Sequence, residues 1–440
     1  MRTSGEFHPL SAPDYLPTEQ LQSLQLQRLR EVTNLAYRQV PLFRQRMDER
    51  GLTPGCLREL ADLARLPFCA KVDLRDTYPF GMFATPMSEI VRLHASSGTT
   101  GKPIVVAYTE SDLHIWQEAM VRCFAAYGLT SGDIIQNSYG YGLFTGGLGA
   151  HYGAEALGAT VIPTSGGNTE RQIMVLRDFG VTAVCCTPSY FLHLCERAAA
   201  LGVDMHDLPL RVGVFGAEPW TEGLRREIEA ASGITAYDIY GLSEICGPGV
   251  GFECWYQDGL HLVEDHFYPE IIDPDTGEVL PDGETGELVL TTLTKQAIPM
   301  IRYRTHDVTS LYAEPCECGR TLRRMHRVRL RTDDMLIIRG VNVFPGQIES
   351  ALLSVEGTLP HYQIVLTTQG GLDRIAVQVE VTSAFFGDRL GEMVTLQRRI
   401  AQALDHTLGL SVEVKLVQPQ TLARSEGKAK RVLDQRERSE

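Results

Sequence analysis

Apolar side chains recur at the helical period near the start of the chain, over residues 18–50. The positions concerned are Leu21, Leu24, Leu29, Val32 and Ala36. This spacing predicts a helical segment. Thr18, followed by an acidic residue, is a plausible helix start.

Short apolar strands then alternate with helical segments over residues 159–244. The strands read "ATVIPT" (159–164), "VTAVCCTPS" (181–189), "LRVGVFGAEPW" (210–220) and "TAYDIYGLSE" (235–244). Between them, "NTERQIMVLRDFG" and "PSYFLHLCERAAALG" have the pattern of helices. This alternation predicts a parallel sheet covered by helices. Ligands of such sheets bind beyond the carboxyl ends of the strands, so the residues that close these strands are site candidates.

The second half of the chain changes to hairpin patterns. From about residue 260 to 330, turns such as "PDTG" and "DGETG" separate alternating runs, which predicts a small antiparallel or barrel-like subdomain. From residue 333 onwards two hairpins, two helices and a final strand form an α+β pattern. We therefore expect an α/β fold with a large N-terminal domain (1–332) of covered sheets and a small, mobile α+β C-terminal domain (333–440).

Composition restricts the class of protein. The chain has 440 residues, long enough for two or three domains with large cores. The formal net charge of -14 argues against nucleic acid or an anionic membrane as the main partner. The N-terminus has no apolar stretch of signal-peptide length, and no run of eighteen apolar residues occurs. We expect a cytoplasmic protein with no membrane or nucleic-acid partner.

Three of the ten cysteines and one histidine suit a metal site. Scattered cysteines in a long chain are typical of reduced thiols. The ligand candidates are Cys254, His261, Cys316 and Cys318. Four soft ligands predict a tetrahedral structural zinc, although their spacing is not that of a standard zinc finger. The alternative is a pair of free thiols on a hairpin.

The segment "HASSGTTGKPIVVAYT" (94–109) combines hydroxyls, glycines and a lysine, as phosphate-binding loops do. It is not a Walker A loop, because Gly98 and Gly101 are only three positions apart and Pro103 follows Lys102. A strand rather than a helix follows it. The alternative is a flexible surface turn.

Four further pieces carry candidate chemistry. "YGLSE" closes a strand with Glu244, an acid that suits Mg²⁺ beside a phosphate loop. "RYRTHD" ends in Asp307, which can accept ribose hydroxyls. "RTDD" joins the two predicted domains, and "RSEGKAKR" places Lys428 near the chain end. Taken singly, Glu244 would be a first-turn helix acid, Asp307 a turn aspartate, and the segment around Lys428 a solvated basic tail.

In this order, the pieces resemble the adenylate-forming acyl-CoA ligases, the superfamily that includes luciferases and peptide-synthetase adenylation domains. The chain is most similar to the phenylacetate–CoA ligase family. The resemblance covers nearly the whole chain and rests on "HASSGTTGKP", "YGYGLFTGGLGAHYGAEALGATVIPTSGGNTERQ", "DIYGLSE", "DGLHLVEDHFYPEIIDP", "RTDDMLIIRGVNVFPGQIE" and "SEGKAKRV".

The resemblance implies roles for individual residues. The loop that grips the ATP phosphates would comprise Ser96, Ser97, Gly98, Thr99, Thr100, Gly101 and Lys102. The adenine and AMP contacts would come from Gly216, Ala217, Glu218, Pro219, Asp238, Tyr240, Gly241 and Ser243. Glu244 would hold Mg²⁺, and Asp307 and Arg331 would bind the ribose. Asp333 would be the hinge about which the C-terminal domain exchanges Lys428, for adenylation, with the loop around Gly340, for thioester formation.

The acyl pocket implied by the family lies in and after "YGYGLFTGG". It would use Tyr139, Phe144, Gly146 and Cys246, and the alternative for the two aromatic residues is a place in the core. Members of the family most often carry a larger apolar residue at the position of Cys246. A smaller side chain there could admit a ring substituent, so hydroxylated or amino-substituted aryl acids compete with phenylacetate.

The expected reaction consumes ATP, joins an aryl acid to AMP with Mg²⁺ present, and transfers the acyl group to CoA. Two alternatives stay open. One is an aryl-acid adenylating enzyme that loads a carrier protein. The other is a non-catalytic nucleotide-binding regulator of the same fold, which would have no need of Lys428. The sequence also leaves the oligomeric state open, with a homodimer as one option.

Overall fold

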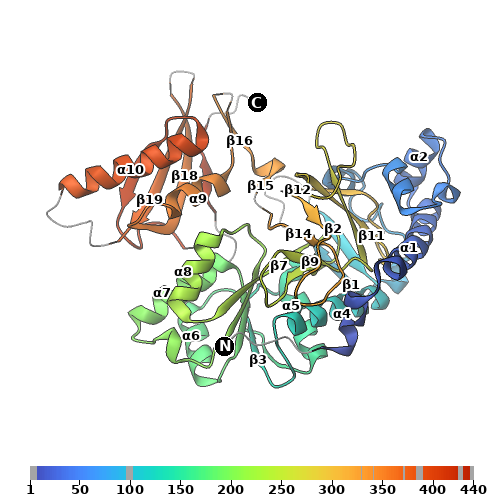
Figure 1. Cartoon of the computed structure of the whole chain (residues 1–440), viewed down its shortest axis with the longest axis horizontal. Helices are drawn as coiled ribbons and strands as arrows, with labels where there is room; N and C mark the ends of the chain where they lie inside the picture. The colour runs from blue at the N-terminus through green and yellow to red at the C-terminus, as the bar shows by residue number, and fades with distance from the viewer. Residues whose placement is uncertain are drawn as a thin grey trace. The chain divides into compact units, whose positions relative to one another are not determined.

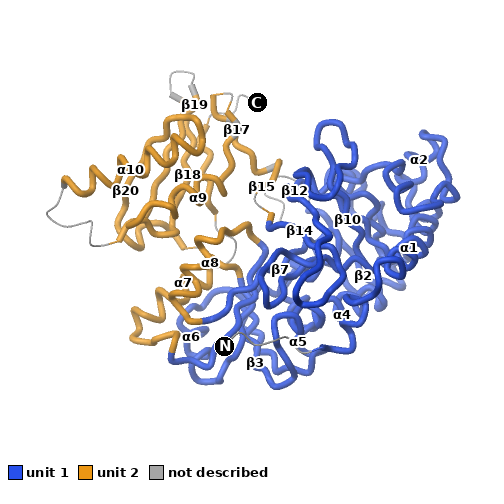
Figure 2. The backbone as a smooth tube through the Cα atoms, viewed as in Figure 1, with its two compact units in different colours: residues 1–186, 207–217, 234–327 blue, residues 187–206, 218–233, 328–440 orange. Residues whose placement is uncertain are grey.

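The chain divides into two compact units, which Figure 2 shows in blue and orange. The first unit comprises residues 1–186, 207–217 and 234–327, and the second comprises 187–206, 218–233 and 328–440. The computed structural model describes residues 7–95, 103–328, 330–339, 341–369, 372–382, 390–424 and 430–436. The predicted boundary at Asp333 stays a prediction. Two helices from the middle of the chain group with the C-terminal part.

Two helices replace the single helical segment expected over residues 18–50. Helix α1 (Thr18–Gln39) begins where the sequence predicts, and α2 (Pro41–Glu49) follows after Val40. Proline lacks the N–H that would continue α1, but it is well tolerated in the first turn of a new helix. Leu29 and Met47 are fully buried.

A nine-stranded sheet is the centre of the first unit. Its order is β13-β14-β9-β8-β7-β6-β5-β3-β4. The strands are β3 (Ile134–Asn137), β4 (Thr160–Ile162), β5 (Ala183–Cys186), β6 (Val212–Gly216), β7 (Thr235–Leu242), β8 (Gly247–Glu253), β9 (Leu260–Leu262), β13 (Leu311–Tyr312) and β14 (Arg324–Met325). Pairing is parallel from β4 to β7 and antiparallel from β7 to β13. The predicted parallel sheet is thus confirmed, and hairpin strands extend it.

Helices of the first unit pack on this sheet. α4 (Glu110–Ala126) and α5 (Thr145–Leu157) lie side by side and both contact β8 (Figure 1). α4 begins at a capping box, in which the Thr109 side chain accepts from the Asp112 N–H and the Asp112 carboxylate accepts from the Thr109 N–H. Further elements of this unit are α3 (Lys71–Asp76), α6 (Thr169–Asp178) and the antiparallel pair β1 (Arg92–Ala95) and β2 (Val105–Tyr108).

The hairpin region of residues 260–330 contributes to two sheets. β10 (Phe267–Ile272), β11 (Gly286–Thr292) and β12 (Tyr303–Thr309) form an antiparallel sheet. β9, β13 and β14 instead extend the large sheet. The turn sequences predicted the hairpins, but they carry no information on which sheet each short strand joins.

The second unit contains the expected α+β elements around one core. The strands of its four-stranded sheet, in the order β20-β19-β18-β21, are β20 (Glu413–Val417), β19 (Leu372–Val381), β18 (Thr358–Gln369) and β21 (Val432–Asp434). The other elements are α7 (Pro188–Ala200), α8 (Glu222–Ser232), the hairpin β16 (Leu336–Ile338) and β17 (Val341–Val343), α9 (Pro345–Leu353) and α10 (Leu390–Leu408). Ile364, Val377 and Ile400 are fully buried in the core.

Polar contacts join α7 and α8 to the C-terminal elements of this unit. Glu196 of α7 hydrogen-bonds to His361 of β18 and lies 3.4 Å from Arg424. Thr221, which caps α8, donates to the Glu349 carboxylate of α9 at 3.2 Å. Among the helices of the described residues, none combines the length and apolar character that crossing a membrane requires.

Candidate active site

The turn between β7 and β8, residues 243–246, carries several of the predicted site residues. It follows a tight approach of the two strands, since a Cβ on Gly241 would lie 1.8 Å from the carbonyl oxygen of Gly247. Only glycine fits there. The backbone of the turn is closed by hydrogen bonds from the N–H groups of Ile245 and Cys246 to Leu242.

Glu244 is a nearly buried carboxylate in this turn, with 6% of the residue exposed. Its Oε1 lies 3.6 Å from the ammonium of Lys71, at the start of α3. The acid that the sequence assigns to Mg²⁺ is therefore accompanied by a cation. Lys71 is not predictable from the sequence, because nothing in "FCAKVDLRD" shows that this segment packs against a turn so far along the chain.

Tyr240 and Asp307 come together from different sheets. The Tyr240 hydroxyl of β7 donates to Asp307 Oδ2 of β12 at 2.6 Å. Asp307 is 3% exposed. Asp238, two residues before Tyr240, pairs with Arg327 at 3.0 Å, and its N–H donates to Glu253. In this structure Asp238 therefore supports the strand.

The predicted adenine segment begins at the end of β6. A Cβ on Gly216 would lie 2.3 Å from the Ile239 carbonyl oxygen, so the backbone can approach β7 only with glycine there. Ala217 follows with a φ of 69°, an unfavourable conformation for a residue with a side chain. Pro219 is exposed. Within the second unit, Glu218 accepts a hydrogen bond from the Ser189 N–H at 2.9 Å.

Two of the predicted acyl-pocket residues, Phe144 and Gly146, lie at the start of α5, which contacts the β7–β8 turn. Thr145 Oγ1 lies 2.9 Å from Ser243 Oγ, which places the first turn of α5 against the β7–β8 turn. A Cβ on Gly146 would lie 2.3 Å from the Phe144 ring. Phe144 is 37% exposed, whereas Tyr139 and Cys246 are buried. Burial raises the pKa of the Cys246 thiol to about 12, so this cysteine is neutral and acts as a small apolar side chain.

Some predicted residues lie outside the described part of the chain or at its edges. The phosphate loop (Ser96 to Lys102), Gly340 and Lys428 are outside the described residues. Arg331 belongs to β15 (Leu330–Arg331), and its Nε lies 3.7 Å from Asp334 Oδ2. Asp333 lies in the 3₁₀ turn Thr332–Asp334.

The four candidate zinc ligands form one cluster. Their ligand atoms all lie within 4.8 Å of one another. Cys254 Sγ is 3.6 Å from Cys316 Sγ, and Cys318 Sγ is 3.4 Å from His261 Nε2. A tetrahedral zinc with its usual bond lengths separates two sulfurs by about 3.8 Å and a sulfur from a nitrogen by about 3.5 Å. The two observed distances therefore match those of a tetrahedral zinc site.

The electrostatics of the cluster also suit a cation. Hydrogen bonds from Cys254 and Cys316 lower the pKa of the Cys318 thiol, and hydrogen bonds to Cys316 and then to Cys318 raise the pKa of Cys254. Burial alone would lower the pKa of His261, but the facing sulfurs raise it. One shared thiolate is thus already favoured before a metal binds.

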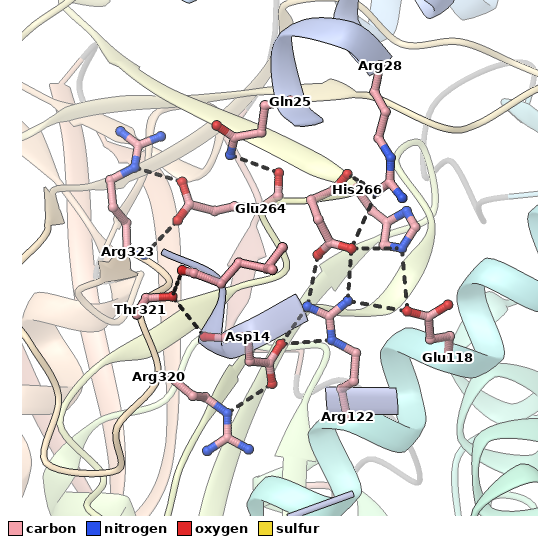
Figure 3. Close-up of polar contacts among 12 residues, drawn as sticks. Asp14, Gln25, Arg28, Glu118, Arg122, Glu264, His266, Arg320, Thr321 and Arg323 are labelled. Carbon is pink, nitrogen blue, oxygen red and sulfur yellow. Dashed lines mark hydrogen bonds and ion pairs between the residues drawn. The ribbon is translucent and has the colours of Figure 1, made fainter. Parts of the chain in front are cut away.

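A buried ion network connects the segment after this cluster to α4 (Figure 3). Arg320 donates to Asp14 at 3.0 Å, and Asp14 also accepts from Arg122 of α4 at 2.8 Å. Arg122 further donates to Asp265 at 2.9 Å, and its side chain is fully buried. The N-terminal segment, α4 and the cysteine loop are therefore held together by charge.

Comparison with known proteins places this site in a family. Residues 79–293 match the family model of AMP-binding enzymes, and residues 340–436 match that of the AMP-binding enzyme C-terminal domain. The chain is 51% identical over 438 residues to a phenylacetate–coenzyme A ligase of Escherichia coli (strain K12), covering 99% of both chains. It is 50% identical over 435 residues to a phenylacetate–coenzyme A ligase of Thermus thermophilus, covering 96% of this chain and 98% of that one.

The chain belongs to the phenylacetate–CoA ligase family. It is an AMP-forming acid–thiol ligase, which joins an aryl acid to CoA through an acyl-adenylate and consumes ATP. The predicted α/β fold with a small C-terminal α+β domain is confirmed.

Solved structures of another ligase have the same fold as this phenylacetate–CoA ligase family member. 2-Hydroxyisobutyryl-CoA ligase in the postadenylation state, in complex with 2-HIB-AMP, superposes with a TM-score of 0.91 at 28% identity. The same ligase with 2-HIB-AMP and CoA in the thioesterification state gives a TM-score of 0.72 at 29% identity. Both comparisons cover 99% of this chain and 95% of the other.

Proposed function

We propose that this ligase activates phenylacetate, or a ring-substituted relative, and transfers the acyl group to free CoA. The observation that carries the proposal is the contact between the start of α5 and the β7–β8 turn. It brings the first turn of α5, which contains Gly146 and follows Phe144, against the β7–β8 turn, which carries Glu244 and Cys246. The chain is 50% and 51% identical, over nearly its full length, to two phenylacetate–coenzyme A ligases, and this similarity supports phenylacetate as the acid.

The first step is attack of the aryl carboxylate on the α-phosphorus of ATP, with pyrophosphate as leaving group. Two anions must approach, so positioning and charge neutralisation dominate this step. Glu244 would hold Mg²⁺, which neutralises phosphate oxygens when bound. Lys71, 3.6 Å from Glu244, would keep this carboxylate oriented and add positive charge at the same place.

The ribose would bind at Asp307. A carboxylate can accept both ribose hydroxyls, and Tyr240 already donates to one of its oxygens. This hydrogen bond fixes the carboxylate and presents the tyrosine ring beside it. We assign Tyr240 to the adenine side of the nucleotide, with Gly216 and Ala217 at the end of the neighbouring strand β6.

The second step is attack of the CoA thiol on the acyl carbon, with AMP as leaving group. Pyrophosphate and pantetheine cannot easily share one site, so a rearrangement between the steps is expected. Lys428 would serve adenylation, the loop around Gly340 would serve thioester formation, and Asp333 would be the hinge. The existence of postadenylation and thioesterification states in 2-hydroxyisobutyryl-CoA ligase supports this scheme.

Ring substitution is the open part of the substrate assignment. Cys246 is smaller than the apolar residue most often expected there, and it is buried and neutral. A hydrophobic pocket distinguishes one methylene by about 1–3 kcal/mol, so a modest change in side-chain volume alters the preference among ring substituents. Amino- and hydroxy-substituted phenylacetates are therefore the informative rivals.

Pyrophosphate exchange into ATP with a panel of acids tests the acid assignment. We expect the highest kcat/KM with phenylacetate or a substituted phenylacetate, and much lower values with benzoate and 2-hydroxyisobutyrate. Exchange driven best by a short aliphatic acid would contradict the proposal. A competition between CoA and a phosphopantetheinylated carrier protein then tests the acceptor, with acyl-CoA as the expected product and an acylated carrier as the contrary result.

We also assign a structural zinc to Cys254, His261, Cys316 and Cys318. The cluster supports this by its interatomic distances, its burial and its shared thiolate. Four protein ligands leave no open coordination position, so the zinc would stabilise the fold and take no part in the reaction.

A further inference from the structure

Lys295 is a buried lysine that lies directly behind the β7–β8 turn. It follows β11 in the sequence "LTKQAIPM", and the residue is 5% exposed. Burial lowers the pKa of its ammonium, which means that keeping the charge there is costly. Among the described residues, its hydrogen bonds go to main-chain carbonyls, and it forms no ion pair there with a carboxylate.

Those carbonyls belong to the residues that carry the site. Lys295 Nζ donates to the Ile245 carbonyl at 2.9 Å and to the Glu244 carbonyl at 3.4 Å. The next carbonyl, that of Cys246, accepts from the Tyr108 hydroxyl at 2.7 Å. Tyr108 is itself fully buried, and Lys295 Nζ lies 4.7 Å from the centre of its ring.

A tight turn of this kind leaves its own carbonyls without partners in the strand ladder. The β7–β8 pairing resumes only at Gly247, opposite Leu242. Buried carbonyls without a hydrogen bond are costly, so an external donor must satisfy them. One ammonium supplies two donors to adjacent carbonyls, and its charge makes each of these hydrogen bonds stronger than one from a neutral group.

Lys295 is itself firmly held. The N–H groups of the next two residues, Gln296 and Ala297, donate to the Asp112 carboxylate at 2.7 and 2.9 Å. Asp112 also closes the capping box of α4. The start of α4, the lysine and the turn therefore form one continuous chain of hydrogen bonds.

From this arrangement we infer that Lys295 is a positioning residue. It fixes the backbone of Glu244 and Ile245, and with Tyr108, which holds the Cys246 carbonyl, it keeps the geometry of the metal site and the aryl pocket. The inference rests on the proposed roles of Glu244 and Cys246. It predicts a selective defect: loss of Lys295 impairs binding of the metal–nucleotide and of the aryl acid, and leaves the later attack by CoA unaffected.

The test compares Lys295→Met, Lys295→Arg and Tyr108→Phe with Arg122→Met, which removes another buried cation of the same unit, one that pairs with Asp14 and Asp265. Hydrogen exchange of a peptide covering residues 243–247, compared with other peptides of the first unit, should be selectively faster in Lys295→Met, whereas Arg122→Met should show no such selectivity for this peptide. The half-saturating Mg²⁺ concentration and the KM for the acid should rise about tenfold or more, as expected for losing a charged hydrogen bond. Lys295→Arg should restore part of the Mg²⁺ affinity and part of the affinity for the acid. Tyr108→Phe should raise the KM for the acid more than the half-saturating Mg²⁺ concentration.

A control keeps this inference separate from the proposed function. Mn²⁺ binding in the presence of ATP, followed by electron paramagnetic resonance, needs no aryl acid, and Lys295→Met should weaken it whichever acid is the substrate. If hydrogen exchange rose throughout the first unit, or if Arg122→Met raised the same constants, Lys295 would be a general stability residue and the inference would be wrong.

Discussion

Glu244 combines near-complete burial with a lysine 3.6 Å away. Burying a carboxylate is costly unless a cation or hydrogen bonds compensate it. The cation that pairs with Glu244 is Lys71, whose side chain is only partly buried. Lys71 therefore orients the Glu244 carboxylate through this ion pair. The β7–β8 turn is contacted by two lysines: Lys71 pairs with the Glu244 side chain, and Lys295 donates to the Glu244 carbonyl.

Replacing Glu244 with Gln should raise the Mg²⁺ concentration that adenylation requires and slow pyrophosphate exchange, because a neutral amide is a weaker magnesium ligand. The measurement is the initial rate of exchange as a function of Mg²⁺ concentration at saturating acid. Glu270→Gln is the matched control, since Glu270 of β10 is an equally buried acid and pairs with Arg302. An identical Mg²⁺ curve for Glu244→Gln and the parent enzyme would remove Glu244 from the metal site.

At the scale of elements, the cysteine cluster joins the loops after β8 and β13 to β9. We expect the purified protein to contain about one zinc per chain, as four ligands imply. Cys316→Ser and Cys318→Ser should lose the metal and lower the thermal midpoint, whereas Cys195→Ser, a buried cysteine of α7, should keep it. Elemental analysis and thermal unfolding with and without chelator measure both. If the protein contained no metal and chelator did not change its thermal midpoint, the zinc assignment would be wrong, and these residues would be ordinary thiols and an ordinary histidine.

The ion network at α4 gives a second prediction at this scale. Arg122→Met would leave Asp14 and Asp265 buried without their cation, and removing one partner of such a network costs about 3–5 kcal/mol. Denaturant unfolding at neutral pH should show this loss.

The pH dependence of that loss follows from Asp265. Burial would raise its pKa, but Arg122 and its other cations hold the pKa well below the usual range. A carboxyl with a depressed folded pKa adds stability that is complete above its unfolded pKa of about 4 and is lost as pH falls through the folded value. The stability gap between parent and Arg122→Met should therefore narrow below about pH 4. A gap of constant size from neutral to acid pH would contradict this account.

At the scale of the whole molecule, the two half-reactions should separate by variant. Lys428→Ala should cripple adenylation but leave thioester formation from supplied acyl-adenylate largely intact, because in the proposed scheme Lys428 would act at the α-phosphate and in the first step alone. Exchange assays and a CoA reaction with preformed adenylate measure the two steps. Equal loss in both would contradict alternation of the C-terminal domain.

The sequence predicts the parallel sheet and the C-terminal elements because their periodicity is local and each strand ends in a turn residue. It does not predict the break before Pro41, the short strand β21, or the joining of β9, β13 and β14 to the large sheet. These depend on packing between distant segments. Packing between distant segments also limits what the sequence predicts of the site. Glu244 and Asp307 stand in recognisable motifs, but Lys71 and Lys295 are identified only by their contacts in the folded chain.

The most direct test of the account is a single-turnover experiment with enzyme in excess over phenylacetate. Enzyme, ATP and Mg²⁺ without CoA should yield phenylacetyl-adenylate and one equivalent of pyrophosphate, detected by mass spectrometry after acid quench. Addition of CoA should then convert the adenylate to phenylacetyl-CoA and AMP, faster than water hydrolyses it. Formation of ADP in place of AMP, or no adenylate with any aryl acid, would contradict the assignment of this chain as an adenylate-forming aryl acid–CoA ligase.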